Sequence, residues 1–280
     1  MILITGATGM VGGELTQQLL AAGQSVRVLT RDPQKAAALK GQAEIVEGDL
    51  GKPETLQTAF NGIERMFLVT ANTQQDANAL RAAKAAGIHH VVKLSTLEAV
   101  DSAMIEHVKW HREREELIRA SGLDWTFLRP TMFMSTALEW SRTIRDAGAI
   151  YFPGGEGKVP VVDPWDIAAV AAATLTGVGH EGQAYALTGP QALGFDEMAD
   201  VFSRVLQKPV RYVNISDQAA GAEMRKAGLP EYVVEGLIGT FAAVRSGKLA
   251  FATDDVERVI GRPPRSFETW CKCHLTAFLS

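Results

Sequence analysis

The sequence predicts an α/β protein with a doubly wound parallel sheet in the strand order 3-2-1-4-5-6. Short apolar runs alternate with amphipathic segments through the first half of the chain, which is the pattern of a parallel sheet covered by helices on both faces. Gly6, Gly9 and Gly12 follow the first apolar run and precede an amphipathic segment. Right-handed crossovers between such units give this strand order and a fold of the Rossmann type.

Each expected strand is an apolar run that stops at a glycine or a polar turn. The six strands are placed at residues 2–4, 26–29, 44–47, 66–69, 91–94 and 125–128. Gly23 ends the first helix, Asp32 caps the second ahead of Pro33, and Gly87 ends the fourth. Later helices of this half are expected at residues 53–60, 76–86 and 104–121.

Composition and charge are those of an ordinary globular chain of 280 residues, with 46% hydrophobic and 21% charged residues. A net charge of −4 speaks against a nucleic-acid surface. Cys271 and Cys273 are too close and too few for a disulfide framework, which fits a reducing compartment. A strand beginning at residue 2 leaves no room for a cleavable signal, and no apolar run is long enough to span a bilayer. We therefore expect a cytoplasmic protein with no membrane partner.

In a doubly wound sheet the ligand lies along the carboxyl ends of the strands, so the residues that follow each strand form the predicted site. The glycine turn offers a tight bend, close approach of a pyrophosphate, and a helix N-terminus with free N–H groups. Its spacing, G-x-x-G-x-x-G, is a variant of the usual fingerprint, and a plain strand-to-helix turn is the alternative. The residues expected at the other strand ends are Arg31, Asp49, Leu50, Thr70, Ala71, Ser95 and Thr96.

Arg31, at the end of the second strand, indicates NADP(H) as the cofactor. An acidic residue in this region would bind the ribose 2′-hydroxyl of NAD, whereas an arginine accommodates the 2′-phosphate of NADP. Lys35 lies one helical turn further on and adds a second positive charge. Asp32 is the complication: in the alternative interpretation, Arg31 is a solvated loop charge and Asp32 merely caps its helix.

After residue 130 the pattern becomes mostly helical, beginning with a helix of bulky apolar residues. Residues 159–175 and a strand at 184–187 are expected to return to the sheet. The remaining elements are expected at residues 196–206, 210–213 (a short strand), 217–227, 230–246, 254–260 and 267–278. The chain thus divides into an NADP-binding Rossmann domain, residues 1–134 plus 158–188, and a smaller, mostly helical C-terminal substrate lobe, residues 135–157 plus 189–280.

His107, His111 and Glu115 recur every four residues in the expected helix 104–121 and share one face of it. A charged helix with incidental histidines is one interpretation. Two histidines one turn apart and a carboxylate could also bind zinc, but nothing else in the pattern calls for a metal, and none is predicted. Our working hypothesis is a proton relay in which His111 acts within reach of Ser95 or Thr96.

Several motifs together resemble the NmrA-like atypical short-chain dehydrogenase/reductases, nearest to their NADPH-dependent quinone reductase and triphenylmethane reductase branch. They are the TGATGMVG turn at residues 5–12, Arg31, Gly48-Asp49, His111-x-x-x-Glu115, TFLRP at 126–130, VPVVD at 159–163, YALTGP at 185–190 and SFETW at 266–270. The resemblance covers essentially the whole chain. It implies that His111 lies near the nicotinamide and that NADP is lined by Gly6, Thr8, Gly9, Met10, Val11, Arg31 and Thr70.

One departure from the wider superfamily bears on the reaction. The positions of its Tyr-x-x-x-Lys pair fall on His107 and His111, and no tyrosine lies in this helix. A ketone needs a positioned proton donor as its alkoxide develops, whereas a quinone or conjugated dye does not. We therefore predict NADPH-dependent reduction of quinones or similar conjugated acceptors. A homodimer is a separate expectation. The alternative is a non-catalytic NADP(H) sensor that acts through a protein partner. A third interpretation, isoflavone- or ether-type reduction, would require lysine at residue 111, where this chain has histidine.

Overall fold

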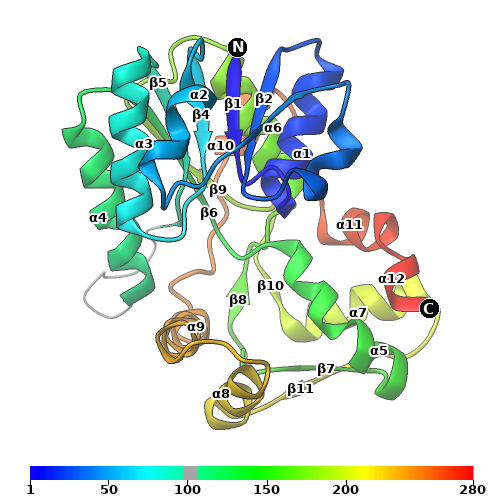
Figure 1. Ribbon diagram of the computed structural model, residues 1–280. Helices are drawn as coiled ribbons and strands as arrows, with labels where there is room; N and C mark the ends of the chain where they lie inside the picture. The colour runs from blue at the N-terminus through cyan, green and yellow to red at the C-terminus, as the bar shows by residue number, and fades with distance from the viewer. Residues whose placement is uncertain (98–105, 280) are drawn as a thin grey trace.

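The computed structural model describes residues 1–97 and 106–279, and the side chains of all of these except residues 106–109. A parallel sheet of seven strands forms its centre (Figure 1). The strand order is β3-β2-β1-β4-β5-β6-β9, which confirms the predicted order and adds β9 beside β6. The strands are β1 (Ile2–Thr5), β2 (Val26–Thr30), β3 (Glu44–Glu47), β4 (Arg65–Leu68), β5 (His90–Leu94), β6 (Asp124–Pro130) and β9 (Gln183–Leu187).

Successive strand residues point to opposite faces of the sheet, and both faces are buried. Ile2 and Ile4 pack into one apolar core, whereas Leu3 packs into the other. The first core is covered by α1 (Met10–Ala21), α6 (Pro164–Thr176) and α10 (Asp255–Ile260). The second is covered by α2 (Leu56–Phe60), α3 (Thr73–Ala86) and α4 (Glu106–Ala120), which Figure 1 shows on the opposite side of the sheet.

Two connections in this half are tighter than expected. The helix after Asp32 is a 3₁₀ helix, η1 (Pro33–Leu39), and the expected helix 53–60 is divided into η2 (Pro53–Thr55) and α2. Each begins with a proline, which fixes φ and donates no hydrogen bond. The Asp32 side chain accepts a hydrogen bond from the backbone N–H of Gln34 at 3.0 Å, so it caps η1 as predicted.

The remaining elements enclose a third apolar core, built around Trp140, Phe195, Phe241 and Trp270. Figure 1 shows them below the sheet. The predicted helix 267–278 is two helices separated by His274 and Leu275, and the predicted strand at 210–213 pairs with β7. The elements are η3 (Met134–Trp140), α5 (Ser141–Ala147), β7 (Ala149–Phe152), β8 (Lys158–Val159), β10 (Leu193–Gly194), α7 (Phe195–Leu206), β11 (Arg211–Asn214), α8 (Asp217–Lys226), α9 (Glu231–Arg245), α11 (Phe267–Cys273) and α12 (Thr276–Leu279).

The β9 edge of the sheet is covered by the chain before and within α10. The backbone N–H of Ala186 donates to the Asp255 carboxylate at 2.7 Å, and its carbonyl accepts from the hydroxyl of Thr253. These contacts occupy groups that an open edge would offer to another strand. Val256 of α10 lies in the same core as the β1 and β2 side chains. The proposed boundaries between the two domains remain a prediction.

Candidate cofactor and active site

The turn after β1 accepts only glycine at two of its three glycine positions. Gly6 has φ of +70°, a conformation strained for residues with a side chain. A Cβ atom on Gly12 would lie 2.2 Å from the carbonyl oxygen of Gly6, so α1 packs directly against the turn. Gly9 precedes α1 as its N-cap and makes no side-chain cap hydrogen bond. The first N–H groups of a helix have no partner within the helix, so those of α1 would be available to bind an anion.

A cavity of about 380 Å³ lies beside this turn, at the carboxyl ends of β1 to β4. It is lined by Thr5, Gly6, Thr8, Leu29, Thr30, Arg31, Asp32, Lys35, Gly48, Asp49, Leu50, Val69, Thr70, Ala71 and Gln75. The structure thus brings together all of the predicted cofactor-binding residues except Gly9, Met10 and Val11, which lie at the start of α1 outside the lining.

Gln75 is a cavity residue that the sequence analysis missed. Asn72 caps α3 by accepting a hydrogen bond from the N–H of Gln75 at 3.0 Å, and the Gln75 side chain accepts from the N–H of Ala71 at 2.7 Å. An Asn followed three residues later by Gln is close to the capping-box pattern, so this spacing was the available signal. The result is a wall from residue 70 to residue 75 that is fixed by its own hydrogen bonds.

Two exposed cations, Arg31 and Lys35, lie on one side of the cavity. Asp32, between them in sequence, uses its carboxylate to cap η1. A dinucleotide that carries an additional phosphate fits this arrangement: its pyrophosphate would approach the glycine turn, and its 2′-phosphate would approach the guanidinium of Arg31. The residues present therefore fit NADP(H).

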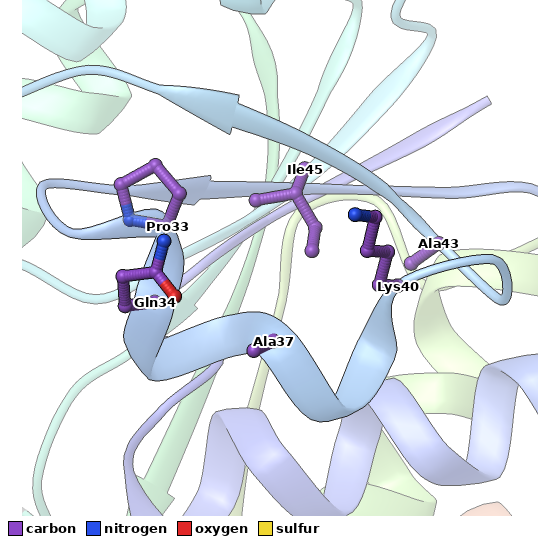
Figure 2. A pocket seen from close by; sticks show the side chains of 6 residues that line it. All are labelled: Pro33, Gln34, Ala37, Lys40, Ala43 and Ile45. Atoms are coloured by element: carbon purple, nitrogen blue, oxygen red, sulfur yellow. The ribbon is translucent and has the colours of Figure 1, made fainter.

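A second hollow, of about 430 Å³, lies between η1 and β3 (Figure 2). Its lining is mostly apolar and carries one charged side chain, Lys40. The other residues that line it are Pro33, Gln34, Ala37, Ala43 and Ile45, and none of the predicted site residues is among them. The hollow therefore adds no reactive group to the site.

A buried charged cluster lies behind the cavity wall. Asp76 of α3, Lys93 of β5 and Arg114 of α4 are 0%, 1% and 3% exposed. Asp76 Oδ1 lies 2.9 Å from Lys93 Nζ, and Asp76 Oδ2 lies 2.5 Å from Arg114 Nε. Burial lowers the pKa of Lys93 to about 8, against the opposing effect of Asp76. The Thr70 hydroxyl donates to Asp76 at 2.7 Å, which links the cluster to the cavity.

A second cluster surrounds Glu115, which is 1% exposed. Ser95, just after β5, donates its hydroxyl hydrogen to Glu115 at 2.6 Å. Arg129 of β6 binds the same carboxylate through Nε at 3.0 Å and through a terminal nitrogen at 2.5 Å. Arg119, one turn further along α4, contacts it at 3.2 Å. The Glu115 carboxylate therefore holds α4 against the carboxyl ends of β5 and β6, and the hydroxyl proton of Ser95 is directed toward it.

The three residues predicted to be catalytic lie outside the lining of the cofactor cavity. Ser95 is buried against Glu115, Thr96 is half-buried just after β5, and His111 is half-buried on α4. The side chain of His107 lies outside the described residues. The proton relay through His111 stays a prediction.

The four tyrosines lie on other elements: Tyr151 on β7, Tyr185 on β9, Tyr212 on β11 and Tyr232 on α9. The Tyr185 hydroxyl is hydrogen-bonded to His180, and the Tyr212 hydroxyl donates to the carbonyl of Phe152. Tyr232 is 58% exposed, and its ring contacts Trp110 of α4 with centroids 5.5 Å apart.

No helix in residues 1–97 or 106–279 is long and apolar enough to cross a membrane. Among the side chains that the structure describes, those of residues 1–97 and 110–279, no three or more His, Cys, Asp or Glu are grouped so that they could hold a metal ion. Cys271 is buried, which raises the pKa of its thiol, and Cys273 is exposed. The two thiols therefore lie in different environments.

Known proteins share this architecture along its whole length. Residues 6–177 match the family model described as NAD(P)H-binding. NAD(P)H azoreductase of Xenophilus azovorans is 38% identical over 99% of both chains. The (4-alkanoyl-5-oxo-2,5-dihydrofuran-3-yl)methyl phosphate reductase of Streptomyces griseus is 40% identical, again over 99% of both chains.

Two solved structures with bound cofactor have the same fold. The NADPH-dependent quinone oxidoreductase of Escherichia coli, complexed with NADPH, has a TM-score of 0.88 and 28% identity, covering 99% of this chain and 100% of the other. Triphenylmethane reductase of Citrobacter sp., complexed with NADP(H), has a TM-score of 0.84 and 32% identity, covering 96% and 98%. The likeness to these two reductases that the sequence motifs indicate is confirmed. The chain therefore belongs to the NAD(P)H-binding family, as an NAD(P)H-dependent oxidoreductase.

Proposed function

We propose that this oxidoreductase reduces quinones or similar conjugated acceptors, including dyes, with NADPH as the hydride donor. The names of the relatives describe azo, quinone and triphenylmethane reduction. The substrate of the Streptomyces reductase, by its name, has a ring double bond conjugated with two carbonyl groups. These acceptors share one property: the charge left after hydride addition is delocalised or neutralised. That shared property supports a conjugated acceptor for this chain.

The observation that carries the proposal is the absence of tyrosine from α4, Glu106–Ala120. This helix supplies the proton donor of ordinary carbonyl reductases in the wider superfamily, and here the corresponding positions are His107 and His111. When bound, NADPH supplies a hydride. A quinone that takes up this hydride needs only one further proton, which water can deliver to the resonance-stabilised anion. The protein then contributes to catalysis mainly by holding the cofactor and the acceptor close together in the orientation that hydride transfer requires.

An aromatic pair at the first half of α4 supports a flat acceptor. Trp110 precedes His111 on α4, and its ring contacts Tyr232 of α9 at an interplanar angle of 59°. More than half of the Tyr232 side chain is exposed, so it can present an aromatic surface to a ligand. We place the acceptor on this side of α4, next to the carboxyl ends of β5 and β6.

The test is an assay of NADPH oxidation, measured as the decrease in NADPH absorbance. The acceptors are a naphthoquinone, an azo dye, a triphenylmethane dye and cyclohexanone. We expect turnover with one or more of the conjugated acceptors and none with the ketone. Tight NADPH binding without oxidation by any acceptor would select the sensor alternative. Equal kcat/KM for cyclohexanone and the quinone would contradict the argument from the missing tyrosine.

The homodimer and the cytoplasmic location are further parts of the proposal. A dimer is tested by sedimentation equilibrium across a range of concentrations. A reducing compartment is compatible with the buried thiol of Cys271 and the exposed thiol of Cys273. Neither part bears on the choice of acceptor.

A further inference from the structure

We propose that Asp76 is a positioning residue for the cofactor and acts through Thr70. Thr70 lines the cofactor cavity, whereas Asp76, Lys93 and Arg114 do not. The three charged side chains nevertheless converge on Thr70 from α3, β5 and α4. The inference concerns cofactor binding and does not depend on which acceptor the enzyme reduces.

Burying three charges at one point is costly unless each is paired and hydrogen-bonded. Asp76 pairs with both cations, through a different carboxylate oxygen for each. It is the single acidic partner that the described contacts give to Lys93 and Arg114. Loss of its charge would leave two cations facing each other out of water. The position of every group bonded to the cluster therefore depends on Asp76.

Thr70 is bonded to this cluster through both its hydroxyl and its carbonyl. The hydroxyl donates to Asp76 at 2.7 Å and accepts from Lys93 at 2.5 Å. Arg114 donates to the carbonyl oxygen of Thr70 at 2.7 Å and also contacts its hydroxyl. The hydroxyl is thus committed to the protein, and the backbone at residue 70 is held in one place.

The fixed backbone at Thr70 continues into the rest of the wall. The N–H of Ala71 donates to the side chain of Gln75, and both of these residues line the cavity. A wall that is fixed before the ligand arrives loses little conformational entropy on binding. If Asp76 sets this wall, changing it should weaken NADPH binding while kcat at saturating NADPH changes little.

The first measurement is NADPH affinity by calorimetry for Asp76→Asn, with Asp166→Asn as the matched control. Asp166 is also 0% exposed, binds Arg262 at 2.9 Å and the backbone N–H of Arg265 at 2.7 Å, and does not line the cavity. We expect Asp76→Asn to weaken binding about tenfold. Asp166→Asn is expected to lower stability but keep the NADPH affinity of the wild type. Equal affinities of the two variants would overturn the proposal.

A double-mutant cycle with Thr70→Val then separates action through Thr70 from a general structural effect. In the Thr70→Val background, Asp76→Asn should cost less additional NADPH affinity than in the wild type, because the bonds of the hydroxyl to the cluster are already absent and only the bond from Arg114 to the carbonyl of residue 70 remains. Additive losses would overturn the proposal. If Asp76→Asn does not fold, Asp76→Glu replaces it: this variant keeps the negative charge but moves the carboxylate, and the same non-additivity with Thr70→Val is expected.

Discussion

Arg114 and Glu115, consecutive residues of α4, are both buried and pair in different directions. Arg114 Nε lies 2.5 Å from the Asp76 carboxylate of α3, whereas the Glu115 carboxylate lies 2.5 Å from a terminal nitrogen of Arg129 of β6. Adjacent helical residues point roughly 100° apart, so one turn can reach two neighbours. Through Thr70, Ser95 and Arg129, this turn is bonded to the carboxyl ends of β4, β5 and β6. The helix that carries His111 is thereby fixed to the sheet.

The first prediction concerns Glu115→Gln. The substitution keeps the shape of the side chain but removes the charge that compensates Arg129, and its amide hydrogens face other donors. Breaking such a pair costs about 3 kcal/mol of the free energy of unfolding, because a cation is left poorly solvated. Urea unfolding measures this loss.

Glu116→Gln is the matched control for that measurement. Glu116 follows Glu115 in α4, its side chain is 71% exposed, and it pairs with Arg119 at the surface. An exposed pair of this kind contributes less than about 1 kcal/mol. If the two variants unfold at the same urea concentration, Glu115 is not an anchor of α4.

The second prediction concerns the coenzyme. Arg31→Ala should weaken NADPH binding about tenfold by removing a charge-assisted hydrogen bond to the 2′-phosphate, while NADH affinity stays the same. Lys40→Ala is the control, because Lys40 is an exposed cation just after η1 that lines the second hollow and not the cofactor cavity. The dissociation constants of NADPH and NADH are measured for the wild type and both variants by tryptophan fluorescence. Tighter NADH than NADPH binding by the wild type would reverse the coenzyme assignment.

The strand order could be predicted from the sequence because each sheet strand has apolar residues on both faces and ends at a glycine or polar turn. The same rule located the cavity residues, since parallel strands end at one edge. The sequence pattern did not predict that η1 is a 3₁₀ helix or that the C-terminal helix is interrupted after Cys273. Packing, and not hydrophobic periodicity, determines the type and length of such short helices.

The buried charged cluster could not be predicted from the sequence. Lys93 lies in an otherwise apolar strand, and Arg114 lies within a run of charged residues that looks like a solvated helix face. Only the three-dimensional arrangement brings Asp76 between them. The helical period did identify Glu115, but the interpretation grouped it with the histidines, whereas its contacts are with Ser95 and arginines.

The third prediction concerns the glycine turn. Gly12→Ala places a Cβ atom 2.2 Å from the Gly6 carbonyl oxygen, so α1 must move away from the turn. We expect a loss of about 2 kcal/mol in the free energy of unfolding and weaker NADPH binding. Gly13→Ala is the control: its Cβ would lie 3.3 Å from the Ala7 carbonyl oxygen, and alanine favours a helix. Thermal unfolding with and without NADPH measures both effects, and equal Tm values for the two variants would contradict the account of the turn.

The fourth prediction concerns the proposed proton relay. His111→Ala should lower kcat with a quinone about tenfold, a modest effect because the product anion is resonance-stabilised. NADPH affinity should stay the same, because His111 does not line the cofactor cavity. His89→Ala is the control, since His89 is exposed and precedes β5 at the amino end of that strand. An unchanged kcat in His111→Ala would eliminate the relay.

The last prediction is a pH dependence of stability that arises from His90, which is 1% exposed. Its Nε2 lies 2.9 Å from the Thr126 hydroxyl, and that hydroxyl donates to the carbonyl of His180, so Nε2 is the donor. Nδ1 is buried and has no hydrogen-bond partner among the described residues. Protonation would bury an N–H group without an acceptor. Burial accordingly lowers the pKa of His90, reinforced by Arg65 and His180 and opposed by Glu181 and Asp124.

The sign of the effect follows from proton uptake on unfolding. Below the ordinary histidine pKa of about 6.5, the unfolded chain binds a proton at residue 90 that the folded chain does not. The contribution of His90 to the free energy of unfolding is therefore fully present above this pH. It decreases, by at most about 1.4 kcal/mol per pH unit, as the pH falls toward the lowered pKa of His90. His90→Gln keeps a donor for Thr126 but cannot titrate, so its stability should fall less steeply in urea unfolding below about pH 6.5. The exposed neighbour variant His89→Gln should keep the wild-type slope; if it flattens the slope as much as His90→Gln, the buried imidazole is not the source.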